Sequence, residues 1–199
     1  QNALVHTNRS LNQSMAELST GKRINSAADD AAGLAMGNKM TAQIKSLDMA
    51  IRNANDGISM LQTADGATTT LTSMLVRMSE LAIQSANDTN SDDNRTDLHK
   101  EFQEIQSEMG NILKNTEWNG MAVLDGGAGT AGAVQFHIGP AADDTVTMTM
   151  DSLDTGSLAT AQTLDISTKA GANTALTTLT DAMTELDTSR SQWGAVSNR

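Results

Sequence analysis

The sequence predicts a mainly α protein: an elongated, coiled-coil-like bundle of long antiparallel helices with a small β-hairpin region. Two observations predict this class. Aliphatic and methionine residues recur at helical spacing over long stretches of the chain, which is the pattern of amphipathic helices. A segment in the second half loses that spacing and shows glycines and alternating apolar and polar residues instead, as short strands do.

The longest predicted helix covers Ala31–Ser85. Between Met40 and Leu61 the apolar residues step alternately by four and three positions, which is a heptad pattern. Further apolar residues continue this stripe to Ala82 after a shift of phase. A helix of this length is about 80 Å long and needs a partner along its length.

Three further helices are expected. The polar stretch 87–97 supplies turn and N-cap residues and is predicted to reverse the chain before a helix over Leu98–Lys114. A third long helix covers Ala172–Val196, with Arg190 as the one polar residue on its apolar stripe. The opening segment predicts a shorter helix that ends at Gly21.

Strands are expected between Trp118 and Ile166. The dipeptide Asn119-Gly120 is typical of a tight turn. Apolar and polar residues alternate over 134–138 and again over 146–150, and the residues between them read as a hairpin loop. An isolated hairpin is marginal in water, so the apolar face of this one must pack on the helices.

The chain is acidic and contains no cysteine. Thirteen Lys and Arg residues against 24 Asp and Glu give a formal net charge of −11, a field that repels nucleic-acid phosphates and anionic lipids. The lack of cysteine excludes disulfide scaffolds and Cys-ligated zinc. No apolar run is long enough to span a bilayer, and no leader opens the sequence. We therefore expect no nucleic-acid partner and no membrane insertion.

Residues suited to catalysis are sparse and scattered. The three histidines, His6, His99 and His137, are interpreted as solvated surface side chains, because none has a second histidine at the spacing of a helical metal pair. No nucleophile elbow and no phosphate-binding Gly-Lys-Ser/Thr loop is present in the sequence. The sequence therefore predicts no enzyme, no cofactor and no metal site.

One string copies the start of a calcium-binding loop. Alternating side-chain oxygens occur at Asp88, Asn90, Asp92 and Asn94. The position that needs glycine is Asp93, however, and the twelfth position, which needs a bidentate glutamate, is His99. We interpret the string as a solvated interhelical turn, and the pair Asp143 and Asp144 as a hairpin tip.

Five longer strings are too specific to arise by chance. They are LSTGKRINSAADDAAGLA (18–35), RNANDGIS (52–59), RMSELAIQSAN (77–87), EWNGMAVL (117–124) and WGAVSNR (193–199). Together, and in this order, they resemble the bacterial flagellin family. The family usually has Phe where this chain has Trp118 and Leu where it has Trp193. The centre of the chain is not diagnostic.

The resemblance implies a structural subunit of the bacterial flagellar filament that self-assembles for motility. On the family's pattern, residues 1–30 are the remnant of an inner helix and its connecting spoke. Residues 31–125 and 171–199 are the two halves of a helical rod, and 126–170 is a short variable β-hairpin region. The family's terminal helices continue further, so we expect this chain to be a soluble monomer that cannot polymerise unaided.

The implied partners are other flagellin subunits in a homopolymer, a flagellar export chaperone, the filament cap and the vertebrate Toll-like receptor for flagellin. The implied location is extracellular, in the flagellum, after export without a cleaved signal peptide. No cofactor is implied.

Three residues fall where flagellins present the patch used in protofilament packing and recognised by that receptor: Arg77, Leu81 and Glu104. The first two lie inside a matched string. Glu104 depends on an alignment across a turn that is one residue longer here, and Val76 replaces the Gln often found beside the arginine. From the residues alone, an ordinary solvated helix face explains these three equally well.

Two alternatives stay open. A flagellin-like surface module that binds a glycan or a cation would also fit the acidic surface and the short Gly-rich loops. A hook–filament junction protein with flagellin-like ends is disfavoured, because the strings over 27–35 and 77–87 are typical of flagellin itself.

Overall fold

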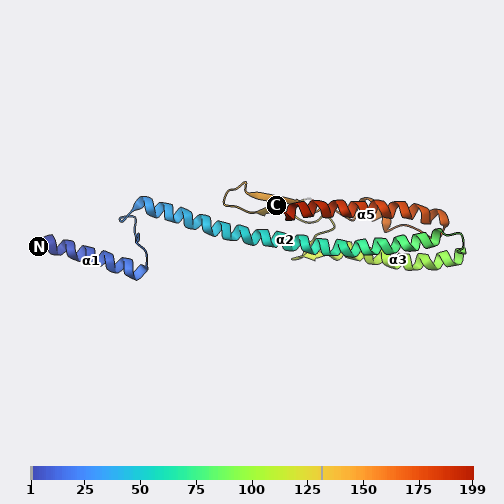
Figure 1. The fold of residues 1–199 in the computed structure, drawn as a ribbon, viewed down its shortest axis with the longest axis horizontal. Helices are drawn as coiled ribbons and strands as arrows, with labels where there is room; N and C mark the ends of the chain where they lie inside the picture. Colours follow the sequence, from blue (N-terminus) through green and yellow to red (C-terminus); the bar gives the residue numbers. More distant parts are fainter. Residues whose placement is uncertain (1, 131) are drawn as a thin grey trace. The chain divides into compact units, whose positions relative to one another are not determined.

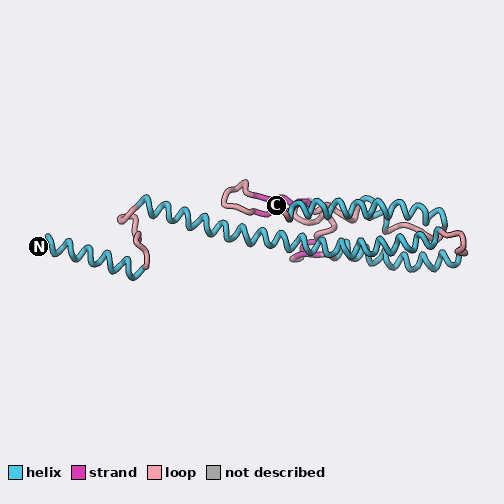
Figure 2. Tube along the Cα trace, viewed as in Figure 1, coloured by secondary structure: helices cyan, strands magenta, loops and turns pink. Residues whose placement is uncertain are grey.

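The computed structural model describes residues 2–130 and 132–199 (Figures 1 and 2). Its elements, in chain order, are α1 (Asn2–Thr20), α2 (Ala31–Ala86), α3 (Asp92–Asn115), β1 (Glu117–Trp118), β2 (Met121–Ala122), β3 (Ala133–His137), β4 (Thr145–Thr149), α4 (Gly156–Ala161) and α5 (Lys169–Ser197). The chain divides into two compact units, the first unit (1–51) and the second unit (52–199). The mainly α class is confirmed.

In the first unit, α1 ends at Gly21 as predicted. Gly21 has a φ of 65°, the left-handed conformation that commonly terminates a helix. In the loop that follows, the carboxylate of Asp29 accepts hydrogen bonds from the backbone N–H groups of Asn25 (3.1 Å) and Ser26 (2.9 Å). These bonds, with that to Ser26 contributing most, lower the pKa of Asp29. A second carboxylate, Asp30, then accepts from the backbone N–H of Gly33 at the start of α2.

α2 is one continuous helix of 56 residues, so the prediction of a single long helix is confirmed. The predicted core role of its stripe holds only in the second unit. Leu71, Leu75 and Met78 are buried there, whereas Met40 and Ile44 in the first unit are exposed. A heptad pattern indicates that a helix is amphipathic, but it does not indicate which part of the stripe the chain itself covers.

The second unit is a bundle in which α3 and α5 both run antiparallel to α2 (Figure 1). The end of α2 lies beside the start of α5, where Lys169 pairs with Asp88 just beyond α2. Further back along α2, Asp65 pairs with Arg190 near the end of α5. Apolar side chains of all three long helices and of the strand region form one core, whose largest fully buried members include Phe102, Met60, Leu71, Leu75, Met78, Met109, Leu113, Leu124 and Met148.

The turn between α2 and α3 is shorter than predicted. The expected polar turn over 87–97 is wrong in its second half, because α3 begins at Asp92. Ser91 is the N-cap, and its hydroxyl accepts a hydrogen bond from the backbone N–H of Asn94 at 3.3 Å. Asp92 and Asp93 then lie in the first helical turn, where negative charge is favoured by the helix dipole.

Two antiparallel hairpins occupy the expected strand region. Asn119 and Gly120, with φ values of 52° and 74°, form the tight turn between β1 and β2. β3 pairs with β4 through residues 133–137 and 145–149, so Ile138 and Met150 lie just outside the strands. This larger hairpin packs on α2 as expected. The ring of Phe136 lies against Gly57, which has no side chain to obstruct it.

The helix α4 was not expected within the segment predicted to form strands. It has six residues, too few for a helical period to be recognised in a sequence. Leu158 and Ala161 of α4 are buried in the common core.

Candidate functional site

Arg77 lies on the exposed side of α2 and is held by two carboxylates. Its Nη2 atom is 2.6 Å from Oε1 of Glu101 on α3, and its Nη1 atom is 2.8 Å from Oε2 of Glu80 one turn further along α2. The hydrogen bond to Glu101 is the main reason that the pKa of Arg77 is raised above its ordinary value, and the bond to Glu80 adds to it. The side chain is 51% exposed, so the arrangement orients the guanidinium at the surface.

Glu104 does not contact Arg77 directly, but both line one surface groove between α2 and α3. We call it the α2–α3 groove; its lining residues are Thr70, Ser73, Met74, Arg77, Glu104, Ile105 and Glu108. Met74 and Ile105 are half-buried and pack against the core, while Glu104 and Glu108 are exposed. The structure therefore brings two of the three expected site residues together.

Leu81 lies elsewhere. It is 1% exposed and belongs to the core, so the interpretation of all three residues as a solvated helix face is wrong for Leu81. Any effect of this residue on the surface is exerted from beneath, through the packing of α2.

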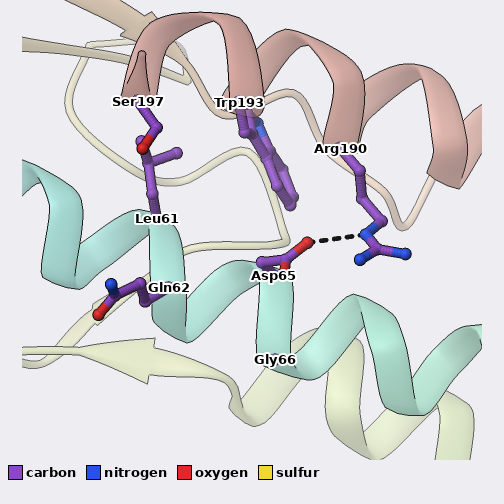
Figure 3. A pocket seen from close by; sticks show the side chains of 8 residues that line it. Leu61, Gln62, Asp65, Gly66, Arg190, Trp193 and Ser197 are labelled. Carbon is purple, nitrogen blue, oxygen red and sulfur yellow. Dashed lines mark hydrogen bonds and ion pairs between the residues drawn. The ribbon is translucent and has the colours of Figure 1, made fainter.

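A second hollow, between α2 and α5, involves residues that the sequence did not single out as a site (Figure 3). Nε of Arg190 lies 2.7 Å from Oδ1 of Asp65, and this hydrogen bond raises the pKa of Arg190. Beside the pair, the indole of Trp193 is buried and donates from Nε1 to the backbone carbonyl of Thr149 at 3.2 Å. The one available signal was Arg190, the polar residue on an otherwise apolar stripe.

The region around the α2–α3 turn contains a polar network. Arg95 is buried and donates to the backbone carbonyls of Ser85 and Asn87. His99, expected to be solvated, is also partly buried: its Nδ1 atom accepts from the backbone N–H of Ile166 at 3.4 Å and lies 3.5 Å from Asp165. The prediction for this histidine is wrong because the segment before α5 folds over it.

The calcium-like string forms the interhelical turn and the start of α3. Asp88 pairs with Lys169, and the side-chain amide of Asn90 donates to the backbone carbonyl of Gln84. Within residues 2–130 and 132–199, no three His, Asp or Glu side chains are grouped so that they could hold a metal ion. Nor does any helix in that described part have the length and apolar character needed to cross a membrane.

These features define a class of protein: a helical rod whose surface features are open grooves between helices and exposed apolar helix faces. Comparison with known proteins then gives the family. The family model described as the bacterial flagellin N-terminal helical region matches residues 1–129. The chain belongs to the bacterial flagellin family, as the five strings indicated.

Similar proteins agree with this assignment. The flagellin of Halalkalibacterium halodurans is 38% identical over 201 residues, which cover 98% of this chain and 73% of that protein. Polar flagellin F of Vibrio parahaemolyticus is 44% identical over 158 residues, or 79% of this chain, but the chain spans only 41% of the length of that protein. The crystal structure of Bacillus cereus flagellin matches with a TM-score of 0.63 and 28% identity, over 74% of this chain and 84% of the other.

Proposed function

We propose that this chain is a structural, non-enzymatic subunit of the bacterial flagellar filament and acts by self-assembly. The observation that supports this function most directly is the apolar stripe on the first part of α2. Met36, Met40, Ile44, Leu47 and Ile51 are spaced as one helix face and are 49% to 66% exposed.

Such a stripe is costly for a solitary molecule. Burying a leucine, isoleucine or methionine side chain contributes roughly 1.5–3 kcal/mol, and contiguous apolar patches on soluble monomers usually mark interaction sites. Helices with a heptad face normally pack against other helices. The stripe therefore supports packing against further helices, as a filament subunit requires.

The finer elements of the proposal follow from family membership. The partners are other subunits of the same kind, an export chaperone and the filament cap, and the location is the extracellular flagellum after export without a cleaved signal peptide. Arg77 and Glu104, which line the α2–α3 groove, are the proposed surface for protofilament packing and for the Toll-like receptor. A role as a glycan- or cation-binding module has no supporting observation in the described residues.

Seeded polymerisation tests the proposal. Purified full-length protein, tagged for gold labelling, is added to sheared flagellar filaments and followed by electron microscopy. We expect labelled subunits to extend the seeds, and we expect a strain that lacks the gene to recover labelled filaments when the gene is returned. The function is wrong if the protein neither extends seeds nor occurs in filaments on the cells.

A further inference from the structure

Charge is distributed unevenly between the two units. Residues 1–51 contain five Lys and Arg against four Asp and Glu, a net charge of +1. Residues 52–199 contain eight against 20, a net charge of −12, so the acidity of the chain belongs to the second unit. Two copies of the second unit repel each other, whereas the region around residue 45 is the part of the chain best suited to approach an acidic surface.

Cations border the exposed apolar stripe of α2. Lys45 directly follows Ile44, and Arg52 directly follows Ile51, so both lie on one flank of the stripe. Lys39 lies on the other flank, and Asp48 is the one carboxylate between residues 36 and 52. Across the residues that the structure describes, none of these three cations forms an ion pair. We call this surface, residues 36–52, the cationic face.

In the second unit, the cations are mostly committed already. Arg77, Lys100, Lys169 and Arg190 each pair with a carboxylate. Arg95 is buried against backbone carbonyls. The acidic surface of this unit is therefore short of cations from its own chain.

The α2–α3 groove is complementary to the cationic face. Met74 and Ile105 provide apolar lining, and the exposed carboxylates of Glu104 and Glu108 lie one helical turn apart on α3. Neither glutamate forms an ion pair with any side chain in the described residues. Arg77 is the one cation in the groove, and Glu80 and Glu101 already hold it.

We propose that the cationic face of one copy docks into the α2–α3 groove of a second copy. Ile44 and Leu47 meet the apolar lining, and Lys45 and Arg52 approach Glu104 and Glu108. The contact joins different surfaces of the two copies, so each copy keeps one free face and one free groove, and repetition gives an open polymer. The inference rests on the proposed filament function and names the surfaces through which copies meet.

Cysteine cross-linking tests the contact directly, because the chain has no cysteine of its own. Full-length Ile44→Cys protein is mixed with full-length Ser73→Cys protein under mild oxidation. Both positions are exposed, and Ser73 lines the groove. The matched control pairs Ile44→Cys with Thr180→Cys, an exposed position on α5 outside the groove. We expect about tenfold more mixed dimer from the groove pair; equal yields overturn the proposal.

A charge swap provides the second test. Lys45→Glu with Arg52→Glu, and separately Glu104→Lys with Glu108→Lys, should each slow seeded elongation about tenfold, the effect of about one interfacial charge pair. Combining all four changes in one chain should restore most of the rate. The control, Lys22→Glu with Lys114→Glu, changes the net charge equally at positions outside both surfaces. Elongation of the two swapped variants at the control rate, or no recovery in the fourfold variant, overturns the contact.

The two tests separate this inference from the filament function. If the wild-type protein fails to extend seeds but the groove pair still cross-links, the filament function is wrong and the contact stands. If filaments form normally while the groove pair gives no more dimer than the control pair, the contact is wrong and the function stands.

Discussion

Arg95 of α3 donates from Nη1 to the backbone carbonyl of Ser85 on α2, with a nitrogen–oxygen distance of 2.8 Å. The last carbonyls of a helix have no partner within that helix and carry partial negative charge. The guanidinium also donates to the carbonyl of Asn87 at 3.0 Å, and the hydroxyl of Ser85 donates to the carbonyl of Ile166 at 2.5 Å. One buried arginine thus ties the end of α2 to α3, beside the segment that leads to α5.

Replacing Arg95 by methionine should lower the free energy of unfolding by about 2–4 kcal/mol. The variant keeps much of the apolar stem but leaves two carbonyls without a charged donor, and each buried group left unpaired costs about 1–3 kcal/mol. Urea unfolding followed by circular dichroism measures the change. Lys100→Met removes only an exposed ion pair with Asp97 and should cost less than about 1 kcal/mol. Equal stability of the two variants would contradict the capping role.

Leu81 and Arg77 should separate clearly when each is changed to alanine. Leu81→Ala empties part of the core and should cost about 2–5 kcal/mol, as other buried leucines do. Arg77→Ala removes exposed ion pairs and should cost less than about 1 kcal/mol. Denaturant midpoints of the purified proteins provide the comparison. A loss of assembly in Leu81→Ala is informative only after its folded fraction is known, whereas Arg77→Ala reports on the surface itself.

Two glycines should respond to alanine in opposite directions. Gly66 lies inside α2 and a Cβ atom there would meet open space, so Gly66→Ala should stabilise the protein by about 0.5–1 kcal/mol. Gly132 has a φ of +80°, and a Cβ atom there would lie 2.7 Å from the carbonyl oxygen of Met150. Gly132→Ala should therefore destabilise it. Thermal unfolding of both variants gives the signs, and a destabilised Gly66→Ala would show that the space beside that residue is filled.

Long-range order along the helices could be predicted from the sequence because it repeats. The 56-residue α2 and the turn at Asn119-Gly120 depend on local spacing and on local backbone preference, which a sequence shows directly. The position of α3 was harder, since Ser91 and the acidic residues after it suit both a turn and the start of a helix.

The candidate site depends on contacts that no local pattern contains. Arg77 and Glu104 share a groove only because the short turn at 87–91 sets the antiparallel register of α2 and α3. The burial of His99 depends on a segment more than 60 residues away, at Asp165 and Ile166. The exposure of Ile44 depends on what covers α2, and spacing alone does not specify that.

Acid should weaken the second unit through two aspartates near the start of α5. The hydrogen bond from Lys169 lowers the pKa of Asp88, and bonds from the backbone and hydroxyl of Ser167 lower the pKa of Asp165. A carboxylate whose pKa is lower in the folded state contributes its full stabilisation above the unfolded value of about 3.9, and loses it as the pH falls through the folded value. Below about pH 4, the urea midpoint of the wild type should therefore fall more steeply than that of the variant Asp88→Asn with Asp165→Asn. At pH 7 the double variant should be the less stable protein. Asparagine keeps an acceptor oxygen at both positions, so the comparison isolates the charge. The exposed carboxylate of Asp181 on α5 forms no ion pair among the described side chains, and Asp181→Asn is the matched control. A difference between wild type and double variant that stays constant from pH 7 to pH 3 would show that these two charges do not stabilise the fold.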